Sequence, residues 1–284
     1  MVALSVDPGR FHSVDPLRVV AGLLAVCLIT SSNYVLNEIL DAPSDRLHPY
    51  KSARPAAARR VHLGAAYFEW ILLMAAGLGL GSVVSFRFTL TLAGLWIAGC
   101  AYNVPPFRTK DVPYLDVVSE SVNNPLRMLA GWYLTMTQAV PITSLLISYW
   151  LAGCYFMAVK RYAECRELAP EALSRYRKSF RWYSERTLLV SILFYGSQAM
   201  LFFGAFIARY RLELILSFPL IALVMAVYFG LAFRPNSPVQ NPEGLYREPL
   251  VVIPVSLCAV VMTVLLFLDV PILHRMFPPT KVGF

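Results

Sequence analysis

Long apolar segments alternate with short polar stretches along the whole of this 284-residue chain. About 20 predominantly apolar residues are enough for a helix to cross a bilayer, whereas the open edge of a sheet leaves backbone groups that lipid cannot satisfy. The pattern therefore predicts an all-α fold, a polytopic membrane helical bundle with about eight transmembrane helices. We expect these helices at residues 16–40, 62–82, 86–104, 116–137, 141–162, 181–208, 211–233 and 248–270.

Composition agrees with a membrane protein that forms a single transmembrane domain over residues 1–284. Hydrophobic residues make up 57% of the chain and charged residues 15%, whereas soluble domains carry about 25% charged residues. The net charge of +8 is compatible with nucleic-acid binding. The basic residues, however, lie in short loops between apolar segments, which is typical of topology determinants that contact anionic lipids. We therefore expect membrane lipids, and no nucleic acid, as partners.

The distribution of basic residues predicts how the bundle is oriented. The loops after the first, third, fifth and seventh predicted helices, with the helix ends beside them, hold 17 of the 25 lysines and arginines, and the opposite side holds seven. Basic loops stay in the cytoplasm. We therefore expect a multi-pass protein of the cytoplasmic (inner) membrane, whose two ends, residues 1–15 and 271–284, are extracytoplasmic tails.

Three oxygen-bearing side chains follow one another at steps of four residues where the first predicted helix ends. They are Asn37, Asp41 and Asp45, and Lys51 and Arg54 follow them. On a helix this spacing puts all three on one face. Magnesium prefers oxygen ligands and often shares them with substrate phosphates. The segment therefore predicts a magnesium site, which faces the cytoplasm by the charge rule above.

A second polar cluster lies on the same predicted side of the membrane. Asp116 and Glu120 stand one helical turn apart, after a loop that contains two basic residues. Two acidic clusters on one side of a bundle suggest a shared pocket for magnesium ions and a diphosphate, with basic side chains that bind the phosphate oxygens. Further polar residues in this region are Arg108, Lys110, Asn123, Asn124 and Arg127.

A third polar segment ends the fifth predicted helix. Lys160, Arg161, Tyr162 and Glu164 directly follow a long apolar stretch. Charge at that position is costly and by default indicates a functional site. We therefore expect this segment to form a cationic wall of the same pocket.

The segment NEILDAPSDRLHPYKSARP resembles the first aspartate-rich motif of the UbiA superfamily of intramembrane transferases, whose core reads N-D-x-x-D-x-x-x-D. Asn37, Asp41 and Asp45 match three metal-site positions of that motif, and Glu38 stands where the family usually has aspartate. The tail of the segment is similar to D-R-x-H-P-x-K-x-x-R-P of the branch that contains decaprenyl-phosphate phosphoribosyltransferase. The K-R-Y-A-E sequence at residues 160–164 also resembles this branch.

Three features depart from the pattern of that branch. The loop YNVPPFRTK is more similar to Y-S-x-P-P-x-x-x-K of prenyl-transferring members such as chlorophyll synthase. The glycine that usually follows R-P is absent after Pro55. The superfamily usually has nine helices and a cytoplasmic N-terminus, so we expect that this chain starts late and lacks the family's first helix.

The resemblance implies a Mg²⁺-dependent membrane transferase that displaces diphosphate from a donor. Two branches stay open. Either a phosphoribosyl group moves from phosphoribosyl diphosphate to a polyprenyl phosphate, or a polyprenyl group moves from its diphosphate to an aromatic or other lipophilic acceptor. We favour the first because of the R-P tail and the K-R-Y-A-E sequence. A transporter or another non-catalytic membrane protein is the alternative from a different class.

The predicted roles follow from this resemblance and from the residue types. Magnesium binding is assigned to Asn37, Asp41, Asp45, Asp116 and Glu120, of which the four acids are also the catalytic residues. Substrate binding is assigned to Lys51, Arg54, Arg108, Lys110, Asn123, Asn124, Arg127, Lys160, Arg161, Tyr162 and Glu164.

Overall fold

The computed structural model describes residues 15–46, 51–135, 141–167, 177–240 and 242–277, except for the side chains of residues 51, 242 and 243. All regular structure in these residues is helical. The α-helices are α2 (Pro16–Asp45), α3 (Leu63–Val84), α4 (Phe86–Asn103), α5 (Leu115–Ser121), α6 (Asn123–Thr135), α7 (Thr143–Glu167), α9 (Glu185–Tyr210), α10 (Phe218–Leu231), α11 (Pro249–Phe267) and α12 (Pro271–Met276). Short 3₁₀ helices are η2 (Lys51–Ala53), η3 (Thr109–Asp111), η4 (Lys178–Trp182), η5 (Leu212–Ser217), η6 (Pro238–Gln240) and η7 (Pro242–Arg247).

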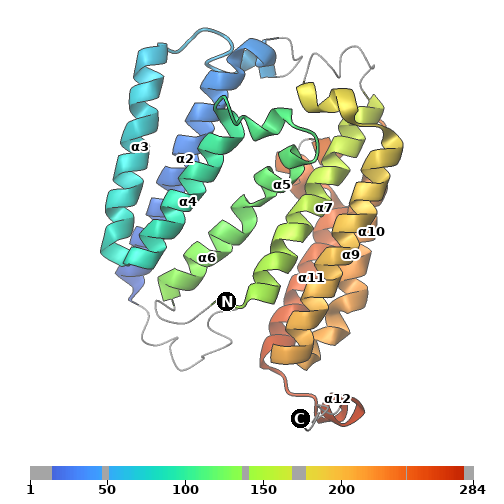
Figure 1. The fold of residues 1–284 in the computed structure, drawn as a ribbon. Helices are drawn as coiled ribbons and strands as arrows, with labels where there is room; N and C mark the ends of the chain where they lie inside the picture. The colour runs from blue at the N-terminus through green and yellow to red at the C-terminus, as the bar shows by residue number, and fades with distance from the viewer. Residues whose placement is uncertain (1–14, 47–50, 136–140, 168–176, 241, 278–284) are drawn as a thin grey trace.

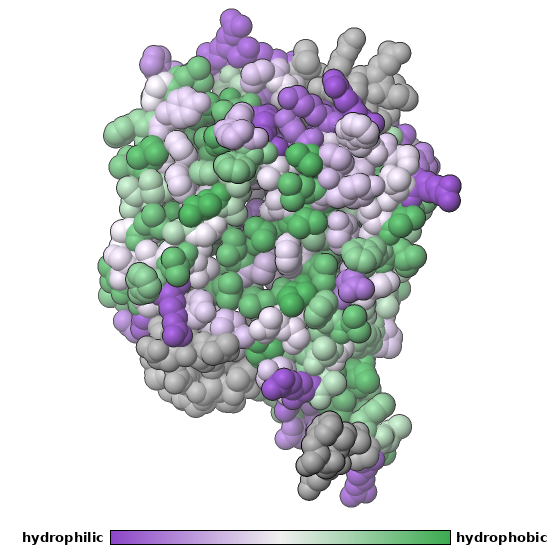
Figure 2. Space-filling view, in the orientation of Figure 1, coloured by the Kyte–Doolittle hydropathy of each residue, from purple (hydrophilic) through white to green (hydrophobic). Residues whose placement is uncertain are grey.

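Each predicted transmembrane segment corresponds to helix in the structure, which confirms the all-α bundle. Five segments of the described chain are long and apolar enough to span a membrane: Pro16–Asp45, Leu63–Val84, Glu185–Tyr210, Leu212–Leu231 and Pro249–Phe267. Figure 2 shows apolar residues over the waist of the molecule and polar residues gathered toward its upper end. These properties are those of an integral membrane protein.

The helices form two groups that an oblique pair connects (Figure 1). In one group α2 packs against α3 and α4, and in the other α7 packs against α9. The segment α5–α6 runs between them and contacts both α4 and α7. The end of α2, the loop with η3, the start of α5 and the end of α7 therefore meet at the upper end of the bundle, whereas α2 begins at the lower end, where α12 also lies.

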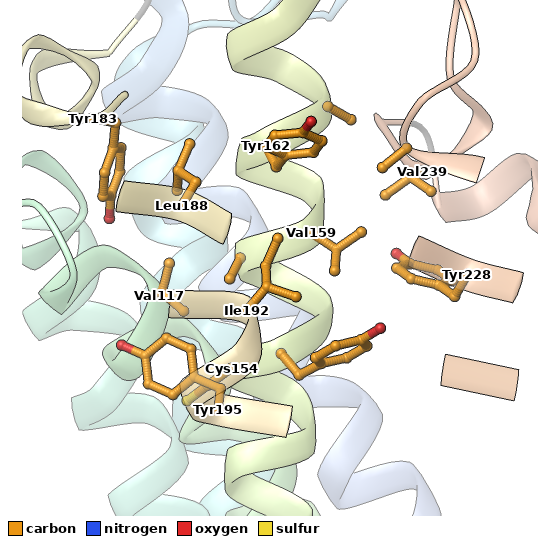
Figure 3. Packing of buried hydrophobic residues seen from close by; sticks show 14 of the residues in the cluster. Val117, Cys154, Val159, Tyr162, Tyr183, Leu188, Ile192, Tyr195, Tyr228 and Val239 are labelled. Atoms are coloured by element: carbon orange, nitrogen blue, oxygen red, sulfur yellow. The ribbon is translucent and has the colours of Figure 1, made fainter. Parts of the chain in front are cut away.

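Each of the two groups of helices has its own apolar cluster. Ala25, Ile29, Phe88 and Leu92 are fully buried where α2 meets α4. Figure 3 shows the larger cluster, in which α7 stands between side chains of α5 and α9 on one side and Tyr228 of α10 on the other. Burying such side chains stabilises a fold by about 1.5–3 kcal/mol each in water, and in lipid close packing takes over this role.

The predicted helix at residues 116–137 is two helices, with a break at Val122. Pro125 has no N–H group and its ring would clash with the carbonyl of Ser121 in a continuous helix. The side chain of Asn123 instead donates to the carbonyl of Glu120 at 2.9 Å. Asp116 lies on α5, on the N-terminal side of this break, and is fully buried.

The ends of the chain fall partly outside the described residues. Of the predicted tail at residues 1–15 only Asp15 is described, and its side chain caps α2 by accepting from the N–H of Leu17 at 3.0 Å. Part of the predicted tail at residues 271–284 is helix α12. The imidazole of His274 on this helix lies 2.9 Å from the carboxylate of Glu213, which anchors α12 to η5.

Candidate active site

Asn37, Asp41 and Asp45 all lie on α2, because this helix continues to Asp45 rather than ending at residue 40. Their spacing of four residues places them one turn apart. Asp45 is buried and pairs with Arg54 at 2.9 Å. Glu38 accepts a hydrogen bond from the N–H of Ala56 at 3.0 Å. The segment after the acidic motif is therefore held back against the helix that carries it.

Lys110 lies at the centre of three oxygen atoms at the end of α2. Its ammonium donates to Asn37 Oδ1 at 3.3 Å, to Asn103 Oδ1 at 2.8 Å and to Asp41 Oδ1. The Lys110 side chain is only 3% exposed. Arg108 donates to the same oxygen of Asp41 at 3.2 Å. Burial lowers the pKa of Lys110, and the neighbouring Asp41 carboxylate opposes this shift.

The loop between α4 and α5 is tightly wound, which brings Lys110 back to α2. Arg108 has a φ of 27° and Tyr114 a φ of 63°, both in the left-handed region that residues other than glycine seldom adopt. Such backbone strain persists where the surroundings fix it, often at functional sites. The Arg108 side chain makes a salt bridge with Asp111 at 3.2 Å, which closes the loop on itself.

Asp116 is the centre of a second cluster and is fully buried. Its Oδ2 accepts from Arg161 Nε at 3.1 Å, Ser179 Oγ at 3.3 Å and Arg177 Nη1 at 3.5 Å. Its Oδ1 accepts from the hydroxyl of Tyr183. Burial, followed by the charge of Asp116, raises the pKa of Tyr183, so this phenol stays a hydrogen-bond donor.

Arg161 extends this cluster to the end of α7. Its Nη1 lies 2.7 Å from Glu164 Oε2, and both side chains are buried. Lys160 is half-buried on the same helix and its charge also acts on Glu164. A buried guanidinium requires a carboxylate partner, because an unpaired buried charge is strongly destabilising. Arg161 has two, Asp116 and Glu164.

Tyr102 connects the two clusters. Its ring lies beneath the Lys110 ammonium, 5.9 Å from centroid to nitrogen, and its hydroxyl accepts from Arg177 Nη2 at 3.2 Å. A continuous polar network therefore leads from Asn37 on α2 to Glu164 on α7. The cations of this network are Arg108, Lys110, Arg161 and Arg177, and its carboxylates are Asp41, Asp111, Asp116 and Glu164. Three guanidinium groups and one ammonium group gathered in one network offer many N–H donors to an anionic ligand.

Other predicted site residues differ in their relation to this network. Glu120 is close enough to Tyr102 for its charge to act on that hydroxyl. Asn124 packs at Gly153 of α7, where a Cβ would lie 2.1 Å from its Nδ2 atom. Arg127 is exposed on α6. The side chain of Lys51 is outside the part of the chain that the structure describes.

Tyr162 is not part of the network. Its ring packs against Phe229 and Phe233, at centroid distances of 6.0 and 5.3 Å, toward the α10 side of α7 (Figure 3). This position accounts for Tyr162 as a core residue, and a contact with substrate has no support in the arrangement.

The sequence analysis assigned no role to five residues of the network. They are Tyr102, Asn103, Arg177, Ser179 and Tyr183. Tyr102 and Asn103 begin the YNVPPFRTK loop, whose similarity to a family motif was a signal that was available. The other three lie in the loop after α7, whose similarity to the phosphoribosyltransferase branch of the family was also an available signal, and tertiary packing brings them to Asp116.

The donor set at α2 suits a magnesium ion only in part. The described residues contain no group of three or more His, Cys, Asp or Glu side chains that would hold a metal ion. Asn37, Asp41 and Asn103 nevertheless present three oxygen atoms toward one point, which the Lys110 ammonium takes in this structure. Mg²⁺ takes six oxygen ligands and commonly obtains several from water and substrate phosphates. These residues therefore fit Mg²⁺ that arrives with a phosphate ligand, whereas Asp116 already accepts from four side chains.

Comparisons with known proteins identify related sequences. Decaprenyl-phosphate phosphoribosyltransferase of Mycolicibacterium smegmatis is 32% identical over 173 residues, which are 60% of this chain and 52% of that protein. The protein of the same description from Corynebacterium glutamicum is 30% identical over 177 residues, which are 61% of this chain and 51% of that protein. This chain thus spans about half the length of these relatives.

The fold itself is similar to solved structures. A UbiA homologue from Archaeoglobus fulgidus, solved with DMAPP and Mg²⁺, superposes with a TM-score of 0.71 at 18% identity, over 92% of this chain and 93% of that chain. Residues 6–242 match the family model described as the UbiA prenyltransferase family. The chain therefore belongs to the UbiA prenyltransferase family, whose members are transferases with a polytopic helical membrane fold.

Proposed function

We propose that this protein is a Mg²⁺-dependent transferase that moves a phosphoribosyl group from phosphoribosyl diphosphate to a polyprenyl phosphate. The observation that carries the proposal is the polar network that Tyr102 connects, in which three guanidinium groups and the Lys110 ammonium lie together. Guanidinium groups would contact a diphosphate placed there, and each of them can donate two parallel hydrogen bonds to phosphate oxygens. The similarity to two decaprenyl-phosphate phosphoribosyltransferases supports the choice of donor and acceptor.

The reaction breaks the bond between the anomeric carbon and the diphosphate oxygen. The electron pair leaves with the diphosphate, and positive charge develops on the carbon. An anionic oxygen of the polyprenyl phosphate then forms the new bond to that carbon, so no proton has to be removed. Arg161 and Arg177 neutralise the charge that builds up on the leaving group, which lowers the barrier.

Glu164 and Asp116 have supporting roles in this proposal. Asp116 fixes the two guanidinium groups at 3.1 and 3.5 Å, so they need no reorganisation when charge develops. Glu164, which holds Arg161 at 2.7 Å, is a carboxylate that can also accept from a ribose hydroxyl. The surrounding bundle keeps water away from the reactive carbon.

Magnesium, when bound, would add charge neutralisation at the phosphate oxygens. Asn37 and Asp41 are the residues of α2 that would hold it, and Asp45, paired with Arg54, is the next acid along the same face. Arg108 and Lys110, which pair with Asp41 in this structure, would then be able to bind the phosphates. By the distribution of basic loops this end of the bundle faces the cytoplasm, where a soluble phosphoribosyl donor is available to it.

Prenyl transfer is the second candidate. It is favoured by the YNVPPFRTK loop and by the UbiA homologues that were solved with DMAPP or GPP. A prenyl diphosphate offers the same leaving group, so the same cations would serve. The two reactions differ in whether the ribose or an allylic chain carries the developing charge.

A transfer assay in membranes tests the proposal. Radiolabelled phosphoribosyl diphosphate, added with and without polyprenyl phosphate, is expected to give a labelled lipid only when the acceptor is present. The Asp41→Asn variant should lose about 100-fold or more of this activity, as when a charge-stabilising group is removed from other active sites. Asp269→Asn is the matched control, because Asp269 is 80% exposed at the opposite end of the bundle.

The alternatives give different results in the same membranes. A prenylated product from a labelled prenyl diphosphate, with no lipid labelled by the phosphoribosyl donor, would replace the first candidate by the second. No product from either donor in folded protein would leave a non-catalytic role, such as transport.

A further inference from the structure

We infer that Asn103 completes a cation site with Asn37 and Asp41, and that the Lys110 ammonium occupies this site until a divalent ion displaces it. The inference rests on the proposed function, since it concerns the magnesium ion of that reaction. It adds a ligand from α4 to a site that the aspartate-rich motif of α2 alone does not complete.

The oxygen atoms around Lys110 are the first observation behind this inference. Three oxygen atoms from two helices converge on one nitrogen: Asn37 Oδ1 at 3.3 Å, Asn103 Oδ1 at 2.8 Å and Asp41 Oδ1. Only one of these oxygens belongs to a charged group. The three acceptors satisfy the three donors of the buried ammonium, and the same mixture of carboxylate and amide oxygens is one that a hard cation accepts as ligands.

The second observation is the fixed orientation of the Asn103 side-chain amide. This side chain is 3% exposed, and its Nδ2 donates to the carbonyl of Gly99 at 3.0 Å. The amide group is therefore fixed with its oxygen toward Lys110 rather than its nitrogen. The oxygen therefore faces the cation before any donor substrate binds. Hydrogen bonds to the other atoms of a metal ligand commonly fix its orientation in this way.

The third observation is the burial of the Lys110 side chain. Its ammonium is 3% exposed and stands over the Tyr102 ring at 5.9 Å, yet it is attached to a flexible four-carbon stem. A divalent ion would outcompete it for Asp41 and push the ammonium away. Because Tyr102 leads from Lys110 to Arg177, the displaced ammonium stays within the network, where it meets the diphosphate.

Binding of Mn²⁺ to the purified full-length chain, followed by electron paramagnetic resonance, tests this exchange. The Lys110→Met variant keeps the volume of the side chain and removes the charge. It should bind Mn²⁺ about tenfold more tightly than the wild type in the absence of diphosphate, because the site is no longer occupied. In the Lys110→Met background, Asn103→Leu should lower Mn²⁺ affinity about tenfold.

Lys178→Met is the matched control. Lys178 is 72% exposed and pairs with Asp111 at 3.5 Å, outside the oxygen cage. Its removal changes the net charge by the same amount and should leave Mn²⁺ affinity unchanged. An equal gain in both variants would mean that general electrostatics, and not displacement from the site, is responsible, and would overturn the exchange.

A second measurement on the wild-type chain covers the case in which Lys110→Met does not fold. Reductive methylation, read by mass spectrometry, should modify Lys110 faster when Mn²⁺ is present, with Lys178 unaffected. Equal protection of Lys110 with and without Mn²⁺ overturns the exchange. Tight Mn²⁺ binding without such a change leaves the proposed function intact, whereas no Mn²⁺ binding even with inorganic pyrophosphate overturns both the exchange and the magnesium part of the proposed function.

Discussion

Asp116 accepts hydrogen bonds from four side chains although it is fully buried. Two of the donors are the guanidinium groups of Arg161 and Arg177, whose separation this one carboxylate controls. The Asp116 cluster thus consists of charged side chains that position one another. Asp116 was predicted as a magnesium ligand, and in this structure it positions the two cations Arg161 and Arg177.

Asp116→Asn should destabilise the protein because it leaves two buried guanidinium groups with one carboxylate fewer. We expect the free energy of unfolding to fall by about 3 kcal/mol, which is typical of a broken buried ion pair. Thermal unfolding in detergent, followed by circular dichroism, measures this. Asp269→Asn removes a carboxylate that is 80% exposed and pairs with Arg211 at 3.1 Å, so its effect should stay below about 1 kcal/mol. Similar losses in the two variants would contradict the role given to Asp116.

Among the elements, the pattern of long apolar segments predicted the all-helical bundle, and the spacing of Asn37, Asp41 and Asp45 predicted their common face. It did not predict the break at Val122, because Pro125 was included in an apolar segment that is long enough to span the membrane as one helix. It also did not predict that Arg177 and Tyr183 reach Asp116. These contacts join elements more than 60 residues apart, and no local pattern encodes them.

The packing of α2 against α4 sets the distance between Asn37 and Asn103. At Gly99 of α4 a Cβ would lie 2.3 Å from the Asn33 side chain of α2. Gly99→Ala should therefore push the helices apart, lower stability by about 1–3 kcal/mol through overpacking and weaken Mn²⁺ binding. Gly131→Ala is the control, since a Cβ at Gly131 has no neighbour within 4 Å. Unchanged metal affinity in Gly99→Ala would show that this spacing does not position the ligands.

At the scale of the whole molecule, the network occupies one end of the bundle and the Glu213–His274 pair lies at the other (Figure 1). The positive-inside rule assigns the first end to the cytoplasm. A membrane-impermeant maleimide should label Asp269→Cys in intact cells, and Lys178→Cys only after permeabilisation, because both positions are well exposed. Labelling of Lys178→Cys in intact cells would contradict the expected orientation.

We propose that the two polar clusters form one donor site. Equilibrium binding of radiolabelled phosphoribosyl diphosphate to the purified full-length chain with Mg²⁺ tests it most directly. Asp41→Asn, from the α2 cluster, and Arg177→Met, from the Asp116 cluster, should each weaken binding by about tenfold, the equivalent of one charge-assisted hydrogen bond, whereas Asp269→Asn should bind like the wild type. Full affinity in either of the first two folded variants would contradict the claim.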